Sequence, residues 1–416
     1  MSTRPGPESH RMRHGLHIAY VGDFVGHGTN LPQLGTAIAV LSARNPKVEI
    51  LEVMCPTDTG LDEPPGVLPE RVRLTPLYDL SRPLSLLRVV KSIRKEKFDL
   101  VIFSLYPTAF GRGNVANLLG LLNPILVSLF SNARVSTIYH NSVRTNDYRK
   151  LGYTRPVDYL RARFIRGLER ALSYRSRMFL TLDSYETTMR RAIAKGNVDR
   201  IDIEFMDAIA GAFTRGLLGK SSISSLPYRR SPHPTILLHG WWGPQKDLRF
   251  ALQTLRQVRR TGRDLHVVLS GGVSRKFPWY QTEFDSVRSE YADVVDEYLG
   301  YVSEATLSDL LIGCDILLLP YVTPGGVSGV LESASFYGMA VIAPDFPEFH
   351  EQAVTKSNVT VARREDFERI LIERIDRFQE LDRTIDIKGG LEKAQTHFGT
   401  FVDKSLGAAS ERGDAD

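Results

Sequence analysis

The chain has almost no cysteine. Cys55 and Cys314 are the only two among 416 residues, and they lie far apart in the sequence. Two isolated cysteines provide neither a disulfide framework nor the paired spacing of a zinc site, which favours a reducing compartment. The first thirteen residues lack the apolar core of a secretory signal. We therefore expect a cytoplasmic protein without disulfide bonds.

Long apolar runs are also missing. The best run, 118–130, has 13 residues and contains Asn123 and Pro124, whereas a membrane-spanning helix needs about 20. We expect a buried helix there. Metal-binding patterns are scarce as well, because the ten histidines are scattered and Asp202 and Glu204 alternate within a predicted strand. The sequence predicts no metal and no cofactor.

The length and composition favour two globular domains. Apolar residues make up 42% of the chain and charged residues 24%, as in soluble proteins. The length is two to three times that of a typical domain. The stretch 211–234 is small, polar and proline-containing, so it is predicted to be the linker. The expected organisation is a disordered tail (1–14), a first domain (15–210), the linker (211–234), a second domain (235–385), a closing helix returning towards the first domain (386–406) and a second disordered tail (407–416).

Short apolar runs alternate with helical patterns in both halves. The predicted strands are 17–23, 48–54, 99–104, 133–140, 177–184 and 200–205 in the first half, and 235–240, 265–272, 315–321, 339–345 and 358–363 in the second. The predicted helices are 31–44, 84–96, 246–260, 305–313, 329–338, 366–378 and 387–406. Such alternation predicts an α/β fold with two doubly wound, Rossmann-like parallel sheets. Ligands bind at the carboxyl ends of such sheets, which would face a central cleft.

The segment 314–351 contains the strongest functional signal. It reads as a buried strand, a turn rich in glycine and serine, a helix beginning near Gly329, and a second buried strand. Unpaired N–H groups and the helix dipole attract negatively charged oxygens at such a helix start. We expect Ser328, Gly329 and Val330 to bind the phosphates of a nucleotide diphosphate, and Glu332 and Ser333 to reach sugar hydroxyls. A plain helix cap is the alternative.

Other candidate residues follow predicted strands. His140 ends a strand and could bind a sugar hydroxyl or a developing charge, and Lys246 could neutralise phosphate oxygens. Trp241 and Trp242 either wall the cleft, stack on a base or sugar, or pack in the core. The remaining candidates are Gly240, Gly272 and Tyr321 on the nucleotide side, and Gly26, His27, Gly28 and Asn141 on the acceptor side.

The basic residues are concentrated between Arg144 and Arg177. This window holds ten basic residues against Asp147, Asp158 and Glu169, so its net charge is 10 − 3 = +7. Aromatic and aliphatic residues lie between the charges. The window is either a solvated helix face or a basic amphipathic surface that contacts an anionic membrane or a phosphorylated acceptor. No nucleic acid is expected, because no nucleic-acid-binding motif accompanies the charge.

Together these residues resemble the GT-B glycosyltransferases of family 4, which are retaining and use sugar nucleotides. The resemblance covers most of the chain in plan and is sharpest over 235–351. Gly240 is followed six residues later by Lys246, as in that family. The residues that fit a family pattern in the later segment are Pro320, Tyr321, Ser328, Gly329, Val330, Ala334, Gly338, Val341, Ile342, Ala343 and Glu351. His140 falls where the family has a histidine near the transferred sugar, and Gly26–Gly28 corresponds to its first glycine-rich loop.

The chain also departs from the family pattern. Trp241 and Gly243 occupy the places where an arginine usually accompanies the lysine, and two glutamates eight residues apart would fall at Gly325 and Ser333. Glu332 is one residue out of register. These departures predict unusual contacts with the donor sugar.

The resemblance implies a retaining, metal-independent hexosyltransferase for a nucleotide sugar. The acceptor is a glycan, a lipid or a small molecule, and peripheral contact with the inner membrane face through Arg144–Arg177 is expected. His140 and Lys246 would act in catalysis. Two alternatives remain: another GT-B enzyme, such as a nucleotide-sugar epimerase or a phosphorylase, and a non-catalytic subunit that binds a nucleotide or sugar.

Overall fold

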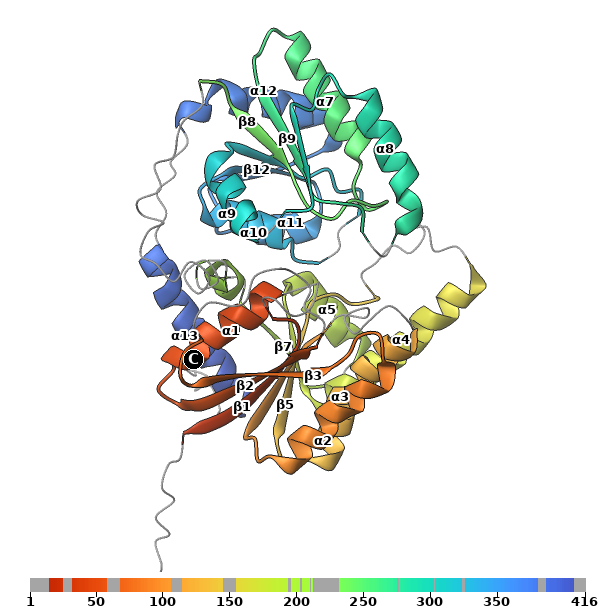
Figure 1. Ribbon diagram of the computed structural model, residues 1–416, viewed down its shortest axis with the longest axis vertical. Helices are drawn as coiled ribbons and strands as arrows, with labels where there is room; N and C mark the ends of the chain where they lie inside the picture. Colours follow the sequence, from red (N-terminus) through yellow and green to blue (C-terminus); the bar gives the residue numbers. More distant parts are fainter. Residues whose placement is uncertain are drawn as a thin grey trace, which may run out of the picture.

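The protein has two lobes, each built on a parallel sheet (Figure 1). The computed structural model describes residues 15–24, 32–57, 68–105, 114–144, 155–193, 196–202, 204–209, 211, 232–274, 277–302, 304–323, 326–380 and 387–407. Both predicted tails except Gly407, and most of the predicted linker, lie outside this part. The arrangement is the α/β fold with two doubly wound domains that the sequence predicts.

The first domain contains a seven-stranded sheet in the order β3-β2-β1-β4-β5-β6-β7. Its strands are β1 (Leu16–Val21), β2 (Val48–Pro56), β3 (Val72–Tyr78), β4 (Leu100–Leu105), β5 (Arg134–Tyr139), β6 (Arg177–Leu180) and β7 (Val198–Arg200). Its helices are α1 (Pro32–Arg44), η1 (Pro83–Leu86), α2 (Leu87–Lys95), α3 (Asn114–Phe130), α4 (Pro156–Arg175) and α5 (Asp183–Ala192). All of its strand pairs are parallel.

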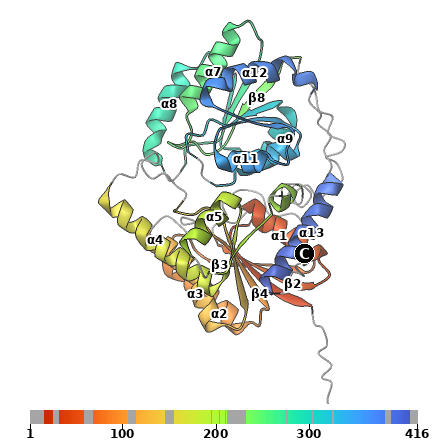
Figure 2. The ribbon, with the colours of Figure 1, turned by 180° about the vertical axis from the view of Figure 1, so that it is seen from behind.

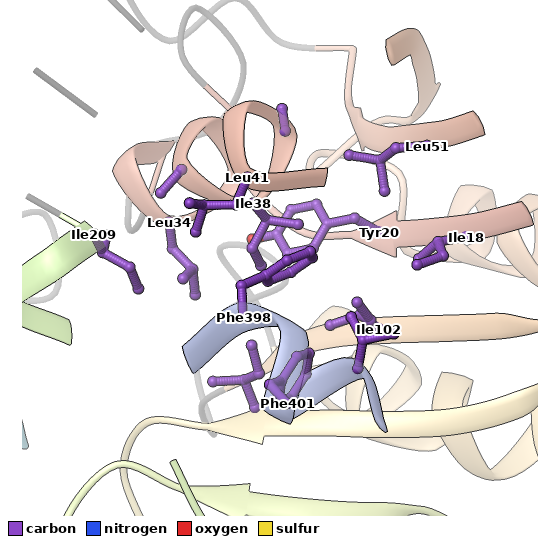
Figure 3. Close-up of a cluster of buried hydrophobic side chains, with 14 of the residues drawn as sticks. Ile18, Tyr20, Leu34, Ile38, Leu41, Leu51, Ile102, Ile209, Phe398 and Phe401 are labelled. Atoms are coloured by element: carbon purple, nitrogen blue, oxygen red, sulfur yellow. The ribbon is translucent and has the colours of Figure 1, made fainter. Parts of the chain in front are cut away.

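Helix α13 (Ile387–Ser405) belongs to the core of the first domain although it follows the second. Phe398 and Phe401 of α13 are buried in the same cluster as Ile18 and Tyr20 of β1 (Figure 3). Phe401 also contacts Phe179 of β6, with ring centroids 4.7 Å apart. The chain therefore crosses between the domains a second time, and α13 covers one sheet face together with α1.

The second domain contains a six-stranded sheet in the order β10-β9-β8-β11-β12-β13. Its strands are β8 (Thr235–Leu238), β9 (His266–Ser270), β10 (Glu297–Gly300), β11 (Ile316–Leu318), β12 (Ala340–Pro344) and β13 (Val359–Ala362). Its helices are α7 (Leu248–Arg260), η3 (Pro278–Tyr280), α8 (Gln281–Glu290), α9 (Glu304–Gly313), α10 (Gly329–Phe336), α11 (Pro347–Ala353), η4 (Arg364–Asp366), α12 (Phe367–Asp376) and η5 (Phe378–Glu380). In Figure 1, α10 and α11 lie towards the first domain, whereas α7 and α12 lie away from it, and Figure 2 shows α11, α7 and α12 in the same arrangement from behind.

Several predicted elements need correction. The predicted strand 200–205 is wrong, because β7 ends at Arg200 and residues 204–209 are helical. The Asp202 carboxylate accepts a hydrogen bond from the Glu204 amide at 3.1 Å, which turns the chain out of the strand. The predicted strand 177–184 ends at Leu180, since α5 begins at Asp183.

The prediction missed two strands, β3 and β10, and both are edge strands. β3 contains Pro76, which an edge strand tolerates, and three of the four residues of β10 are exposed. Neither has the continuous apolar run of a strand covered on both faces.

The run 118–130 lies in α3, as expected, but Leu129 and Phe130 at its end are exposed. No helix in the described part of the chain is both long and apolar enough to span a bilayer.

Candidate functional site

The candidate residues gather at the carboxyl ends of strands in both domains. β5 is followed by His140 and Asn141, and β8 is followed by the loop that carries Gly240 and Lys246. A Cβ atom on Gly326 would lie only 2.9 Å from the carbonyl oxygen of His140. The segment before Ser328 is therefore packed against the His140 segment across the domain boundary. Gly26, His27 and Gly28 lie outside the described residues.

His140 is partly buried and uncharged at neutral pH. Its Nε2 atom is 3.0 Å from the Ser104 hydroxyl at the end of the neighbouring strand β4. Burial lowers the pKa of His140 to about 4. A neutral imidazole can donate one hydrogen bond and accept another, so it can bind a sugar hydroxyl without carrying charge.

A buried carboxylate holds the turn that follows His140. Oε1 of Glu169, on α4, accepts hydrogen bonds from the Tyr139 hydroxyl at 3.1 Å, the Ser142 hydroxyl at 2.9 Å and the Val143 amide at 3.0 Å. Oε2 accepts from Nε of Arg144 at 3.0 Å. Burial raises the pKa of Glu169, while these donors oppose the shift. One side chain thus ties the basic helix α4 to the His140 turn.

Lys246 lies at the predicted sheet edge but is nearly covered. Lys246 is only 3% exposed, and its Nζ atom donates a hydrogen bond to the His239 carbonyl at 2.9 Å. Nζ is also 5.3 Å from the Trp242 ring centroid and 4.8 Å from that of Tyr321. Aromatic faces stabilise a desolvated ammonium. A phosphate that binds Lys246 therefore has to displace part of this cover.

Glycines allow the strand ends of the second domain to pack directly on one another. Gly240 and Gly271 have φ angles of 122° and 91°, in the region that favours glycine. A Cβ atom on Gly271 would lie 2.0 Å from the Gly240 carbonyl oxygen. A Cβ atom on Gly272 would meet nothing within 4 Å, so the backbone there faces open space. This opening adjoins the Lys246 loop, since the Trp242 amide donates to the Gly272 carbonyl at 2.9 Å.

The two adjacent tryptophans have different environments. Trp242, a candidate for contact with the nucleotide, is fully buried; its indole N–H donates to the Ser270 carbonyl at 3.1 Å. Of the readings that the sequence left open, core packing therefore describes Trp242 in this structure. Trp241 is 39% exposed and its ring centroid is 5.7 Å from that of Tyr301. The exposed aromatic surface at this edge therefore comes from Trp241 and Tyr301.

Ser328 is the N-cap of α10, where its hydroxyl accepts from the Leu331 amide at 3.4 Å. Its own amide donates to Oε1 of Gln352 at 3.0 Å. The amides of Gly329 and Val330 begin the helix and have no partner within it. They are the backbone donors that remain for an anion here, and Gly329 is exposed.

Glu332 faces the other domain and belongs to a buried ion-pair cluster. Its carboxylate is buried 3.4 Å from Nζ of Lys356, which in turn lies 2.8 Å from the carboxylate of Asp207 in the first domain. Burial, followed by the neighbouring Asp207, raises the pKa of Glu332 well above its ordinary value. In this arrangement the partners of Glu332 are therefore Lys356 and Asp207, and its contact with the donor sugar stays a prediction. Ser333, the next residue, is only partly buried.

The described residues contain one group of three metal-ligating side chains, Asp202, Glu204 and His397. Nε2 of His397 is 3.2 Å from the Glu204 carboxylate, and Nδ1 is 3.8 Å from that of Asp202. Both carboxylates are about half exposed, with side-chain exposures of 48% and 50%. The group lies between the end of β7 and α13, and Arg200 also pairs with Asp202.

The sequence reasoning missed His239, which follows β8 as His140 follows β5. Its Nδ1 atom is 2.7 Å from the Ser270 hydroxyl, and burial together with the Lys246 charge lowers its pKa to about 3. The signal was the same in both places, a histidine directly after a buried strand. A second neutral imidazole therefore lies beside Lys246.

Comparison with known proteins agrees with this geometry. Residues 233–379 match the family described as glycosyl transferases group 1. A search of curated proteins found no match. In overall fold the chain is similar to Alr3699/HepE of Anabaena in complex with UDP and glucose, with a TM-score of 0.59, 13% identity, and coverage of 95% of this chain and 100% of HepE.

The chain resembles the GT-B glycosyltransferases. Two further structures share the fold. WaaG, a glycosyltransferase involved in lipopolysaccharide biosynthesis, gives a TM-score of 0.54 at 13% identity. The alignment covers 92% of this chain and 95% of WaaG. A UDP-forming α,α-trehalose-phosphate synthase from Burkholderia vietnamiensis gives a TM-score of 0.56 at 12% identity. The alignment covers 95% of this chain and 98% of the synthase. The GT-B resemblance read from the sequence is thus confirmed. The glycosyl transferases group 1 match lies in the second domain of this fold, which holds Lys246 and Ser328.

Proposed function

We propose that the protein is a retaining glycosyltransferase that moves a hexose from a nucleoside diphosphate sugar to an acceptor without a metal ion. The main support is the packing of the His140 turn against the segment before Ser328, at the carboxyl ends of two parallel sheets. The match of residues 233–379 to glycosyl transferases group 1 agrees with it. Because HepE was solved with UDP and glucose, and with UDP-glucose, a UDP-hexose is the first donor to test.

The second domain would hold the diphosphate. Gly329 and Val330 offer amides at a helix start, and Lys246 offers a positive charge once a phosphate replaces its cover. As the glycosidic bond breaks, negative charge builds on the diphosphate, and these donors would stabilise it. The opening at Gly272, beside Trp241 and Tyr301, is the adjoining exposed surface for the rest of the nucleotide.

The first domain would place the sugar and the acceptor. His140 is neutral and its backbone lies at the domain boundary, so its imidazole would hold a sugar hydroxyl while the glycosidic bond breaks. Closure of the two domains would exclude water, which otherwise hydrolyses the donor.

The test is donor turnover. Purified protein is incubated with UDP-glucose, UDP-galactose and GDP-mannose, and release of the nucleoside diphosphate is followed with and without EDTA. We expect slow hydrolysis of one donor that EDTA does not change, and retention at the anomeric carbon in the NMR spectrum of the product. Binding of a nucleotide without any turnover would favour the non-catalytic alternative, and an inverted product would contradict the retaining assignment.

We also propose that helix α4 contacts an anionic membrane that carries or borders the acceptor. Residues 155–177 contain seven arginines against Asp158 and Glu169. The same helix exposes large apolar side chains, with Leu160 68% exposed and Phe164 55% exposed. Leu160, Arg163, Phe164, Gly167 and Leu168 together form an open patch along this helix. Apolar side chains among basic residues are typical of a helix lying in a lipid interface.

Vesicle flotation tests this contact. The triple variant Arg161→Glu, Arg163→Glu, Arg170→Glu should abolish flotation with phosphatidylglycerol vesicles, while affinity for UDP stays unchanged. Leu160→Ser with Phe164→Ser should also weaken flotation, because it removes the apolar part of the surface. Flotation of the charge-reversed protein at the wild-type level would contradict the proposal, and loss of UDP binding as well would indicate misfolding.

A further inference from the structure

A carboxylate of the second domain caps a helix of the first domain. Glu351, on α11, accepts hydrogen bonds from the backbone amides of Asp183 at 2.7 Å and Ser184 at 3.0 Å. These are the first two residues of α5. Leu182 at the N-cap position provides no side-chain acceptor, so α5 has no cap from its own sequence. The Glu351 carboxylate satisfies two amides that would otherwise lack partners and interacts favourably with the helix dipole.

The capping helix α11 also contacts the candidate nucleotide site. Phe349 lies next to the ring of Tyr321, with centroids 5.5 Å apart, and Tyr321 in turn faces Nζ of Lys246. Gln352 accepts from the Ser328 amide at 3.0 Å. Three contacts, to Tyr321, to Ser328 and to α5, therefore come from one helix of seven residues.

The capped helix α5 is connected to the His140 turn through the sheet of the first domain. α5 directly follows β6, and β6 pairs with β5, the strand that His140 follows. A shift of α11 relative to α5 would therefore move the Ser328 segment relative to the His140 turn. Because these two segments are already in contact at Gly326, the Glu351 cap fixes their spacing.

We propose that Glu351 is a positioning residue: by capping α5 across the domain boundary it stabilises the closed arrangement in which His140 faces the Ser328 segment. Its consequence for turnover rests on the proposed function, whereas the domain contact itself does not. Loss of the cap removes a charge-assisted pair of hydrogen bonds. The ratio of closed to open molecules should then fall about tenfold or more.

The contact can be broken from both sides. Glu351→Ala removes the acceptor, with Glu365→Ala as the control, because Glu365 is an exposed carboxylate of the same domain. Asp183→Pro removes the first donor from the other side. Proline suits the first position of a helix, and the preceding Leu182 already has the extended conformation that proline requires, with φ −137° and ψ 145°. Asp183→Ala is the matched control, since it keeps the amide and loses only the side chain.

Distances between the domains give a readout that does not depend on activity. Spin labels at Lys91→Cys and Gln253→Cys lie on exposed positions of α2 and α7, and the native Cys55 and Cys314 are buried. Double electron–electron resonance should show one narrow distance distribution in the double-cysteine background and in both controls. It should show a longer, broader distribution in Glu351→Ala and Asp183→Pro, with Glu351→Gln intermediate because it keeps an uncharged acceptor.

The turnover measurement separates positioning from binding. For a competent donor, kcat should fall at least tenfold in Glu351→Ala while the dissociation constant for UDP stays within twofold, because the UDP contacts lie in the second domain. Unchanged distances in both Glu351→Ala and Asp183→Pro would overturn the proposal. A protein that opens as expected but turns over no donor in any form would leave the cap established and refute the proposed function instead.

Discussion

Removal of the Glu169 carboxylate should loosen the turn that carries His140. Glu169→Ala leaves four donors without their acceptor: the Tyr139 and Ser142 hydroxyls, the Val143 amide and the Arg144 guanidinium. Breaking a buried ion pair costs about 3–5 kcal/mol. The Arg144 side chain is 20% exposed and can regain some water, so we expect about 3 kcal/mol, the lower end of that range.

Thermal unfolding measures this loss. For a domain of this size, 1 kcal/mol corresponds to about 2–4 °C, so the melting temperature of the first domain should fall by about 6–12 °C. Glu186→Ala is the control, since Glu186 pairs with Arg190 on the surface of α5 at 2.6 Å, and such pairs contribute about 1 kcal/mol at most. Hydrogen exchange should also quicken at Val143. Equal melting temperatures for the two variants would refute the role given to Glu169.

Three further predictions concern the site itself. Lys246→Ala should weaken UDP binding by about 1–3 kcal/mol, the range for a charged hydrogen-bonding partner; calorimetry giving unchanged affinity would remove Lys246 from the site. His140→Ala should reduce kcat more than UDP affinity. Because the pKa of His140 is about 4, the contribution of the neutral imidazole to wild-type turnover should be lost only as the pH falls towards that value. A fully active variant would exclude His140 from the site. The pKa of Glu332 is raised above its ordinary value of 4.5, so protonated Glu332 stabilises the folded protein. This stabilisation is complete below pH 4.5 and is lost as the pH rises through the folded-state pKa. Glu332→Gln should therefore make the decline of melting temperature towards alkaline pH shallower, and an unchanged slope would contradict the assignment.

Buried strands and their order of appearance could be predicted because their sequences are apolar without interruption. β4 and β11 are buried at every residue, so each reads as a strand covered on both faces. The edge strands β3 and β10 lack this signal because one side of each faces solvent. The end of β7 was placed wrongly because Asp202 and Glu204 alternate with apolar residues as in a strand, while the Asp202 side chain in fact begins a turn.

The candidate site could be predicted by position but not by side-chain direction. His140, directly after β5, and Lys246, in the loop after β8, lie at the expected edges because parallel strands end together. Which of Trp241 and Trp242 faces solvent depends on the loop's contact with Gly272, which no local pattern encodes. Glu332 has a place in the first turn of a helix, yet its partners Lys356 and Asp207 come from other elements, and one of them from the other domain. The sequence could not reveal this pairing, because it depends on how the two domains pack.

Binding of a nucleoside diphosphate can be measured through the melting temperature of the protein with UDP, GDP, ADP, TDP and CMP, each with and without magnesium. A ligand that binds only the native state must raise this temperature. We predict a selective rise with one nucleoside diphosphate, UDP being the first candidate, that magnesium does not alter. No rise with any of them would contradict a nucleotide-sugar transferase.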